Sequence, residues 1–198
     1  VGMDTTNLVT SDLTRKKPFS NYSVKFDSAD ADYATTQSGI NSILSGATSF
    51  TISSWINFND ASALRPIATN WVAASASYNY ILRFYQNQIQ FYVRANGSTG
   101  NATYSFTPDL NRWYNIVGTW NGSSGPINIY IDGVAGGVQG TRSGTMPTIT
   151  TPEIFGRYVS SVNYYHDGEL SNIAYWKNEL LNEDDILNIY NNGISQDL

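Results

Sequence analysis

The sequence predicts an all-β fold, a sandwich or barrel of roughly nine to thirteen short antiparallel strands in one domain. Three observations lead to this fold class. A length of 198 residues suits a single such domain. Short runs in which apolar and polar residues alternate recur along the chain, with turn residues between them. A helical pattern is recognised at one place alone, near the C-terminal end, so the other elements are expected to be strands.

The first residues differ in character from the rest of the chain. Residues 1–19 are polar and lack a repeating apolar pattern, and Pro18 lies at their end. We therefore expect an N-terminal arm or linker over residues 1–19 and one domain over residues 20–198. An arm that becomes ordered only on a neighbouring molecule would explain this low apolar content.

The strand pattern is clearest in the middle of the chain. Residues 22–26 and 50–58 alternate, and strands are also expected over 113–120, 152–157 and 168–176. The runs 80–85 and 88–93 flank a turn at Asn87 and predict a hairpin. The run 127–131 places three isoleucines on one face and precedes Asp132-Gly133, which is the strongest short hairpin signal.

The helical pattern follows residue 182. Asn182 is a suitable N-cap, and the acidic residues 183–185 lie where the helix dipole favours negative charge. Ile186, Ile189 and Tyr190 form an apolar stripe, and Gly193 is expected to end the helix.

Composition excludes several classes of function. Charged residues make up 14% of the chain, whereas Asn, Ser and Thr together occupy about 60 positions, far above ordinary usage. The net charge is −5, and the basic cluster at 15–17 is too short to neutralise many phosphates, so nucleic-acid binding is not expected. The absence of cysteine excludes disulfides and thiolate chemistry. One histidine excludes multi-histidine metal sites, and no apolar run is long enough for membrane insertion.

Three groups of segments resemble the laminin-G-like branch of the concanavalin A-like lectin/glucanase superfamily. The first is YSVKFDSADADY at 22–33 followed by FTISSWINF at 50–58. The second is RWYNIVGTWNG at 112–122 followed by INIYIDGV at 127–134. The third is FGR at 155–157, DGELSNIAYW at 167–176 and NELLNEDDILNIY at 178–190. The resemblance implies a two-sheet antiparallel jelly-roll sandwich with one short C-terminal helix. Proteins of this superfamily have widely different functions, so the resemblance predicts the fold more closely than it predicts the function.

An enzyme is not expected. Glucanases of this architecture carry alternating carboxylates on one strand, and no Glu-x-Asp-x-Glu pattern occurs among the four glutamates of this chain. Polysaccharide lyases of the fold use an Arg/Gln/His/Tyr constellation, which Arg157, Tyr164, Tyr165 and His166 partly match. A lone histidine beside tyrosines is more often a stacking or hydrogen-bonding group than a base.

Calcium is a candidate cofactor. Asp27, Asp30 and Asp32 form a D-x-x-D-x-D run after the first strand, and closely spaced carboxylate oxygens suit a hard cation. Many members of the resembled family have an aspartate where this chain has Asn172, which weakens a site that depends on that carboxylate. The competing interpretation is a set of Asx turns in which the side chains bond their own backbone.

Glycan binding agrees best with the composition, because sugars need flat aromatic faces together with amides and hydroxyls. Loop aromatics are the candidates: two segments carry them, 70–80 and 157–166, and the resembled fold places both at one rim of the sandwich. We expect one patch there, with Asn70 and Asn79 as further polar partners. The alternative is that these tyrosines pack their loops against the domain or contact a neighbouring subunit. Its predicted ligand-binding residues are Trp71, Tyr78, Tyr80, Arg157, Tyr158, Asn163, Tyr164, Tyr165 and His166.

The sequence therefore predicts a non-catalytic module that binds a glycan or another surface ligand, in an extracellular or particle-surface assembly. A structural or decoration protein of a virion or surface layer is the alternative, with the arm contacting neighbouring copies or other assembly partners. A polysaccharide lyase or hydrolase is the third reading.

Overall fold

The computed structural model describes residues 22–37, 39, 41–72, 78–160 and 162–191. Within them it contains one α-helix, α2 (Glu183–Tyr190), and fourteen strands. The strands are β1 (Val24–Phe26), β2 (Ala34–Thr35), β3 (Ser49–Phe58), β4 (Arg65–Thr69), β5 (Tyr80–Phe84), β6 (Gln88–Ala95), β7 (Ser98–Ser105), β8 (Trp113–Asn121), β9 (Pro126–Ile131), β10 (Val134–Thr141), β11 (Ile154–Phe155), β12 (Arg157–Val159), β13 (Asn163–Tyr165) and β14 (Gly168–Lys177). The all-β prediction is confirmed. The predicted arm lies outside the described residues, so its boundary stays a prediction.

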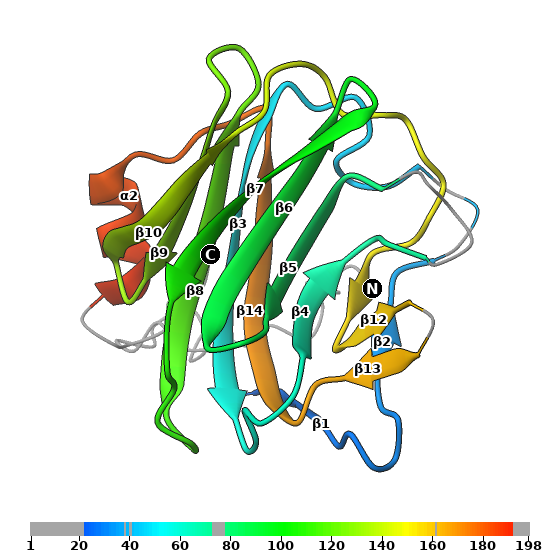
Figure 1. Ribbon diagram of the computed structural model, residues 1–198, viewed down its shortest axis with the longest axis vertical. Coiled ribbons are helices and arrows are strands. Elements are labelled where there is room, and N and C mark those ends of the chain that lie inside the picture. Colours follow the sequence, from blue (N-terminus) through cyan, green and yellow to red (C-terminus); the bar gives the residue numbers. More distant parts are fainter. Residues whose placement is uncertain (1–21, 38, 40, 73–77, 161, 192–198) are drawn as a thin grey trace, which may run out of the picture.

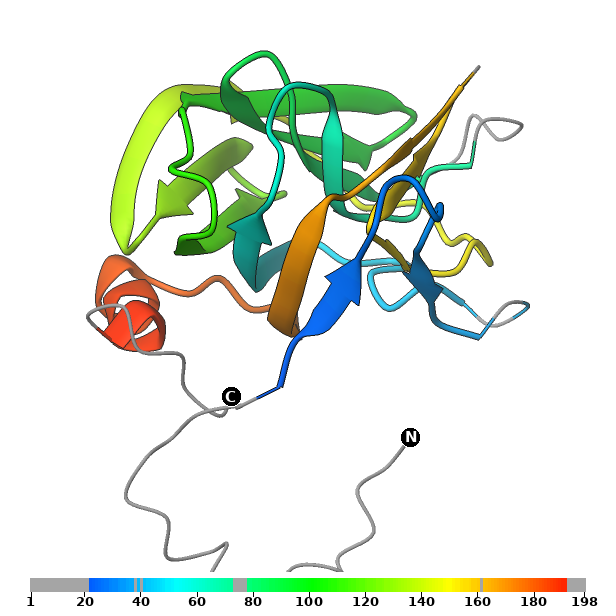
Figure 2. The same cartoon turned by 90° about the horizontal axis from the view of Figure 1, so that it is seen from below.

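Twelve strands form one curled antiparallel sheet. Their order is β1-β14-β3-β8-β9-β10-β7-β6-β5-β4-β11-β2. The curl lies at the pairing of β10 with β7, where Val138 is opposite Thr103. It brings β5–β7 over β3 and β8, which gives the two layers of a jelly roll (Figure 1). In Figure 2 the green strands of one layer lie above, and blue β1 and red α2 lie below.

The core lies between the two layers and is rich in aromatic rings. Phe50 of β3 contacts Phe91 of β6, with ring centroids 5.6 Å apart. Phe58 contacts Phe84 of β5 at 5.5 Å. These four side chains are completely or almost completely buried. Because alternate residues of each strand point inward, the period-two pattern of the sequence supplies this interior.

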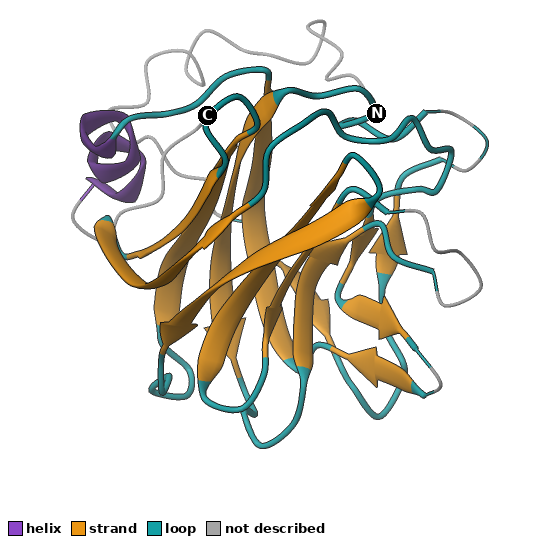
Figure 3. Cartoon of the chain, turned by 45° about the horizontal axis from the view of Figure 1, so that its top comes forward, coloured by secondary structure: helices purple, strands orange, loops and turns teal. Residues whose placement is uncertain are grey.

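Helix α2 covers the outer face of one layer, beside β9 and β10 (Figure 3). Its Ile186 is buried in a second cluster with Val117 of β8 and Tyr130 of β9. Tyr190 at its end stacks on Trp55 of β3 with ring centroids 6.1 Å apart. Strand β3 is therefore buried on both faces along nearly its whole length.

The hairpin turns follow the sequence signals. Gln86 and Asn87, between β5 and β6, have φ angles of 53° and 54°. Asp132 and Gly133, between β9 and β10, have φ angles of 52° and 78°. Two consecutive positive φ angles define the turn that matches the twist of antiparallel strands, and Asn, Asp and Gly adopt them most readily.

Candidate ligand-binding site

The hairpin β12–β13 carries five of the predicted site residues, Arg157, Tyr158, Asn163, Tyr164 and Tyr165, and divides them between its two faces. Tyr158 is opposite Tyr164, and Arg157 is opposite Tyr165. Opposed residues share a face and successive residues alternate, so the two pairs point in opposite directions. The Tyr158 and Tyr164 rings are 6.4 Å apart. Arg157 instead lies 3.7 Å from the ring centroid of Tyr33, on the other side of the hairpin.

Tyr158 meets the first predicted segment. Its ring stacks on Trp71 at a centroid distance of 6.3 Å and an interplanar angle of 24°. Trp71 also contacts Tyr78 edge to face at 4.7 Å. The Tyr78 hydroxyl is 2.7 Å from Thr99 Oγ1 of β7. The prediction that segments 70–80 and 157–166 form one aromatic cluster thus agrees with the geometry for these residues.

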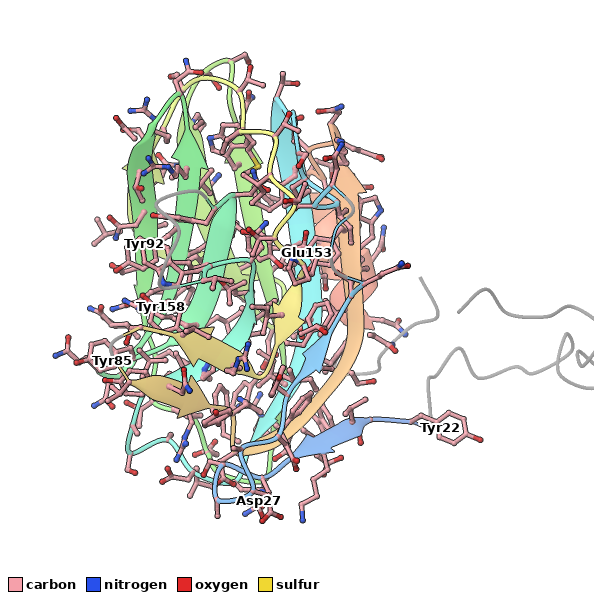
Figure 4. The ribbon with its side chains drawn as sticks, turned by 90° about the vertical axis from the view of Figure 1, so that its right-hand side faces the viewer. Tyr22, Asp27, Tyr85, Tyr92, Glu153 and Tyr158 are labelled. Carbon is pink, nitrogen blue, oxygen red and sulfur yellow. The ribbon has the colours of Figure 1, made fainter. Side chains whose placement is uncertain are left out.

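Arg83 of β5 stands at the centre of the cluster. Its guanidinium carbon lies 5.1 Å from the ring centroid of Tyr158, 5.0 Å from that of Tyr92 and 5.6 Å from that of Tyr85. Its Nε donates a hydrogen bond to Gln90 Oε1 at 3.0 Å. Figure 4 shows Tyr92, Tyr158 and Tyr85 along one side of the molecule, opposite Tyr22.

These side chains, together with Arg94, which lies over Tyr78, form what we call the tyrosine–arginine face. It consists of Trp71, Tyr78, Arg83, Tyr85, Tyr92, Arg94, Tyr158 and Tyr164. All of them except Tyr78 are partly exposed. The face therefore combines flat rings, phenol hydroxyls and guanidinium groups at one accessible surface.

A buried pair of asparagines holds the loop that carries Trp71 and Tyr78. Asn70 Oδ1 accepts a hydrogen bond from the backbone N–H of Asn79 at 2.8 Å, and Asn70 Nδ2 donates to Asn79 Oδ1 at 3.0 Å. Asn79 Nδ2 in turn donates to the carbonyl of Pro147 at 2.8 Å. Both asparagines are completely buried, so they position the loop from inside and are not the surface partners that the sequence predicted.

His166 is also misplaced by the sequence prediction. It is completely buried, between the rings of Phe26 and Phe58. Its Nε2 lies 3.1 Å from the carbonyl oxygen of Asn57, an acceptor, so Nε2 carries the proton and donates. Burial lowers the pKa of His166 to about 4. The side chain is therefore neutral at pH 7, and no ligand reaches it from the surface.

Tyr80 is a core residue as well. Its hydroxyl is 2.6 Å from that of Tyr175, and burial raises the pKa of both phenols. Near them lies Glu153, whose Oε1 accepts hydrogen bonds from Ser42 Oγ at 2.5 Å and from the backbone N–H of Ile43 at 3.1 Å. Burial raises the pKa of Glu153. The alternation of β5 explains the error, because Tyr80, like Phe84, points inward.

The remaining predicted residues lie away from the cluster centre. Tyr165 shares the Arg157 side of the hairpin, and its carbonyl accepts a hydrogen bond from Arg65 Nη1 at 3.0 Å. Asn163 is exposed at the start of β13. The structure therefore brings together Trp71, Tyr78, Tyr158 and Tyr164 but not Arg157, Asn163 or Tyr165.

Sequence reasoning missed Arg83, Tyr85, Tyr92 and Arg94. The signal was present in the predicted hairpin. With Ile89, Phe91 and Val93 inward, the intervening residues of β6 must point outward, and Tyr92 and Arg94 are among them. Arg83 occupies the corresponding outward position of β5, opposite Gln90.

The aspartates proposed for calcium make backbone hydrogen bonds. Asp27 Oδ1 accepts from the N–H of Ala29 at 2.9 Å, and Asp32 Oδ2 accepts from the N–H of Asp27 at 3.1 Å. Asp30 is exposed. No group of three potential ligands from His, Cys, Asp and Glu that could hold a metal is found in the described part of the chain. These hydrogen bonds agree with the Asx-turn alternative, and calcium binding itself is untested.

Among the described residues, no helix has the length and apolar character needed to cross a membrane. No curated protein matches the sequence. Solved structures do share the fold. A heptameric SAP-like pentraxin from Limulus polyphemus has a TM-score of 0.58 at 15% identity, over 88% of this chain and 79% of that chain.

Two further structures are similar. Domains LG4-5 of the mouse laminin alpha1 chain give a TM-score of 0.59 at 15% identity, over 77% of this chain and 40% of that one. The binding domain of botulinum neurotoxin serotype D gives 0.63 at 15% identity, over 89% and 46%. The chain thus spans less than half of either.

The family comparison covers most of the sequence. The laminin-G-type model of the concanavalin A-like lectin/glucanases superfamily matches residues 27–187, which include every strand from β2 to β14. This range also contains the whole tyrosine–arginine face. The chain belongs to the concanavalin A-like lectin/glucanases superfamily.

Proposed function

We propose that this chain is a non-catalytic module that binds a glycan through the tyrosine–arginine face. The observation that carries the proposal is the partly exposed Trp71–Tyr158 stack next to Arg83 and its three tyrosines. Flat aromatic faces pack on the C–H side of a pyranose ring, and the phenol and guanidinium groups bond its hydroxyls. The assembly that would carry such a module is extracellular or lies on a particle surface, such as a virion.

Several features support a non-catalytic role. His166 is enclosed by the core and neutral at pH 7, and Arg157 and Tyr164 point to opposite sides of their hairpin. The lyase-like constellation considered from the sequence is therefore not assembled. Glu153, the carboxyl group with a raised pKa, is buried beneath the surface, where no substrate reaches it.

A glycan array followed by calorimetric titration tests the proposal. We expect the wild-type protein to bind at least one glycan and Tyr158→Ala to weaken that binding by about tenfold or more, since buried aromatic contacts dominate such interfaces. Tyr22→Ala is the matched control, because Tyr22 is 84% exposed and lies on the opposite side of the molecule. Equal affinity of the two variants, or an array without binding, would refute the proposal.

A structural subunit of a surface assembly is the second candidate. It is favoured by β1, an edge strand with Val24 56% exposed, next to an apolar hollow of about 240 Å³ lined in part by Phe26, Phe155 and Ile173. Exposed edge strands pair readily with a strand of a second copy. Light scattering of the wild type and of Val24→Asp distinguishes this role: a dimer or larger oligomer that the substitution dissociates supports it, and a monomer at all concentrations rejects it.

A further inference from the structure

We infer that the ligand of the tyrosine–arginine face is an acidic glycan, one whose sugars carry carboxylate or sulfate groups. The inference rests on the proposed function and adds the charge of the ligand to it. It comes from the distribution of charge over the fold rather than from the aromatic rings.

Carboxylates are missing from both segments that build the face. Residues 61–108, which include β4, β5, β6 and β7, contain no Asp or Glu but contain Arg65, Arg83 and Arg94. Residues 154–166, which include the hairpin β12–β13, contain no Asp or Glu either. The chain as a whole has 16 acidic residues and a net charge of −5, so this surface is basic on an acidic protein.

The outward residues of the two central strands are neutral or basic. Arg83 of β5 is opposite Gln90 of β6, and Arg94 of β6 is opposite Thr99 of β7. The neighbours on the same face of β6 and β7 are Gln88, Asn101 and Thr103. These amides and hydroxyls donate and accept hydrogen bonds without charge, as sugar hydroxyls require.

The two arginines lack acidic partners within the described chain. The ion pairs found there join Arg65 to Asp60 and Arg112 to Asp109 and Asp132. The hydrogen bonds of Arg83 go to neutral groups, from Nε to Gln90 Oε1 and from Nη2 to the Tyr92 hydroxyl at 3.3 Å. Within the described residues the positive charge of Arg83 is therefore not compensated by a carboxylate, and its tyrosine rings hold the guanidinium in place before a ligand arrives.

A carboxylate or sulfate fits this arrangement. The planar guanidinium presents N–H groups in a fixed geometry that matches two oxygens of an oxyanion, and such charge-assisted bonds are shorter and stronger than neutral ones. The surrounding rings reduce the exposure of the guanidinium to water. The attraction between the guanidinium and an oxyanion is therefore screened less than at an open surface. A neutral sugar would form no ion pair with the guanidinium.

Matched pairs of probes test the inference. One pair is an oligogalacturonate and its methyl ester, which differ in the carboxylate charge. The second pair is a κ-carrageenan oligosaccharide and the same oligosaccharide after desulfation. Calorimetry or biolayer interferometry with the wild-type chain, at low and at high NaCl, measures each affinity.

We expect the charged member of at least one pair to bind about tenfold or more tightly than its neutral partner, with a preference that falls as salt rises. Arg83→Gln should reduce that preference to about one, and Arg94→Gln should reduce it in part, which provides a second variant if the first does not fold. Arg112→Gln is the control. Arg112 also lies over a tyrosine, 4.3 Å from the Tyr114 ring centroid, but it already has carboxylate partners.

The outcomes separate the inference from the proposed function. If neutral and charged members bind equally and Tyr158→Ala weakens both, the face binds glycans but the inference is wrong. If Arg83→Gln and Arg112→Gln change the charge preference equally, the inference is also wrong, because overall charge rather than this site would explain it. Failure of every probe to bind, together with an array on which only neutral glycans bind, overturns the inference alone, whereas an array without any binding overturns both.

Discussion

His166 shows how a single side chain links the core to pH. It is buried between Phe26 and Phe58, and burial lowers its pKa from 6.5 to about 4. The unfolded chain therefore binds this proton more readily than the folded chain. The neutral imidazole contributes its full stabilisation of the folded chain above pH 6.5, and this contribution is lost as the pH falls toward 4.

We expect the free energy of unfolding to decrease by about 3 kcal/mol across this pH range because of His166 alone. Urea unfolding at half-unit pH steps between 7 and 4 measures the change. His166→Gln keeps a donor for the Asn57 carbonyl but cannot ionise, so its curve should be flatter. A variant as acid-sensitive as the wild type would contradict the assignment.

Glu153 has the opposite dependence. Burial raises its pKa above 4.5, so the folded chain holds the proton more tightly than the unfolded chain. Its contribution to stability is therefore present at low pH and is lost as pH rises above 4.5 through the raised pKa. In Glu153→Gln this loss disappears.

The expected result is that the stability of Glu153→Gln relative to the wild type increases as pH rises from 4 to 8. Denaturant unfolding of both proteins at each pH gives the difference. Glu179→Gln serves as the control, because Glu179 is exposed, and its difference from the wild type should not follow this trend. A difference for Glu153→Gln that does not change with pH would show that Glu153 is ionised in the folded chain without cost.

At the scale of elements, helix α2 depends on its first turn. Asn182 Oδ1 accepts a hydrogen bond from the N–H of Asp185 at 3.0 Å, and Asp185 Oδ2 accepts one from the N–H of Asn182 at 3.1 Å. The two bonds form a capping box.

Asn182→Ala should destabilise the protein by about 1 kcal/mol, the usual cost of losing an N-cap side chain. Asn182→Ser keeps an acceptor and should remain close to the wild type. Thermal or urea unfolding measures both. Equal stability of the alanine and serine variants would mean that packing against β8 and β9 holds the helix without its cap.

The same elements show how much could be predicted. Local signals such as the Asn182 cap and the Asp132-Gly133 turn gave the helix start and a hairpin, because they depend on neighbours in sequence. The helix ends before the predicted Gly193, which lies outside the described residues: Tyr190 is its last residue, and Asn191 adopts a left-handed conformation with φ 45°.

The candidate site was harder to predict because it depends on strand faces. Tyr80 and Tyr92 are similar tyrosines in neighbouring strands, yet one points into the core and the other to the surface. Their directions follow from the inward set of each strand rather than from residue type. The resemblance brought segments 70–80 and 157–166 together, but nothing in it indicated that Arg83 would lie between them.

At the scale of the whole molecule, a metal ion bound only by the folded chain would raise its stability. One carboxylate oxygen of Asp27 and one of Asp32 already accept hydrogen bonds from backbone N–H groups. We therefore expect the same melting temperature in EDTA and in millimolar calcium, measured by differential scanning calorimetry. A rise with calcium that Asp32→Asn abolishes would establish the ion after all.

The arrangement of the two layers also determines the direction in which the tyrosine–arginine face points. The described chain starts beside β1 and ends after α2, both of which belong to the layer opposite β5 and β6. A tether at either point leaves the tyrosine–arginine face turned away from its anchor. Copies of the protein anchored side by side would then present a row of identical binding sites with the same orientation. A sugar polymer with a repeating structure would bind several of these sites at once, and therefore far more tightly than it binds one site.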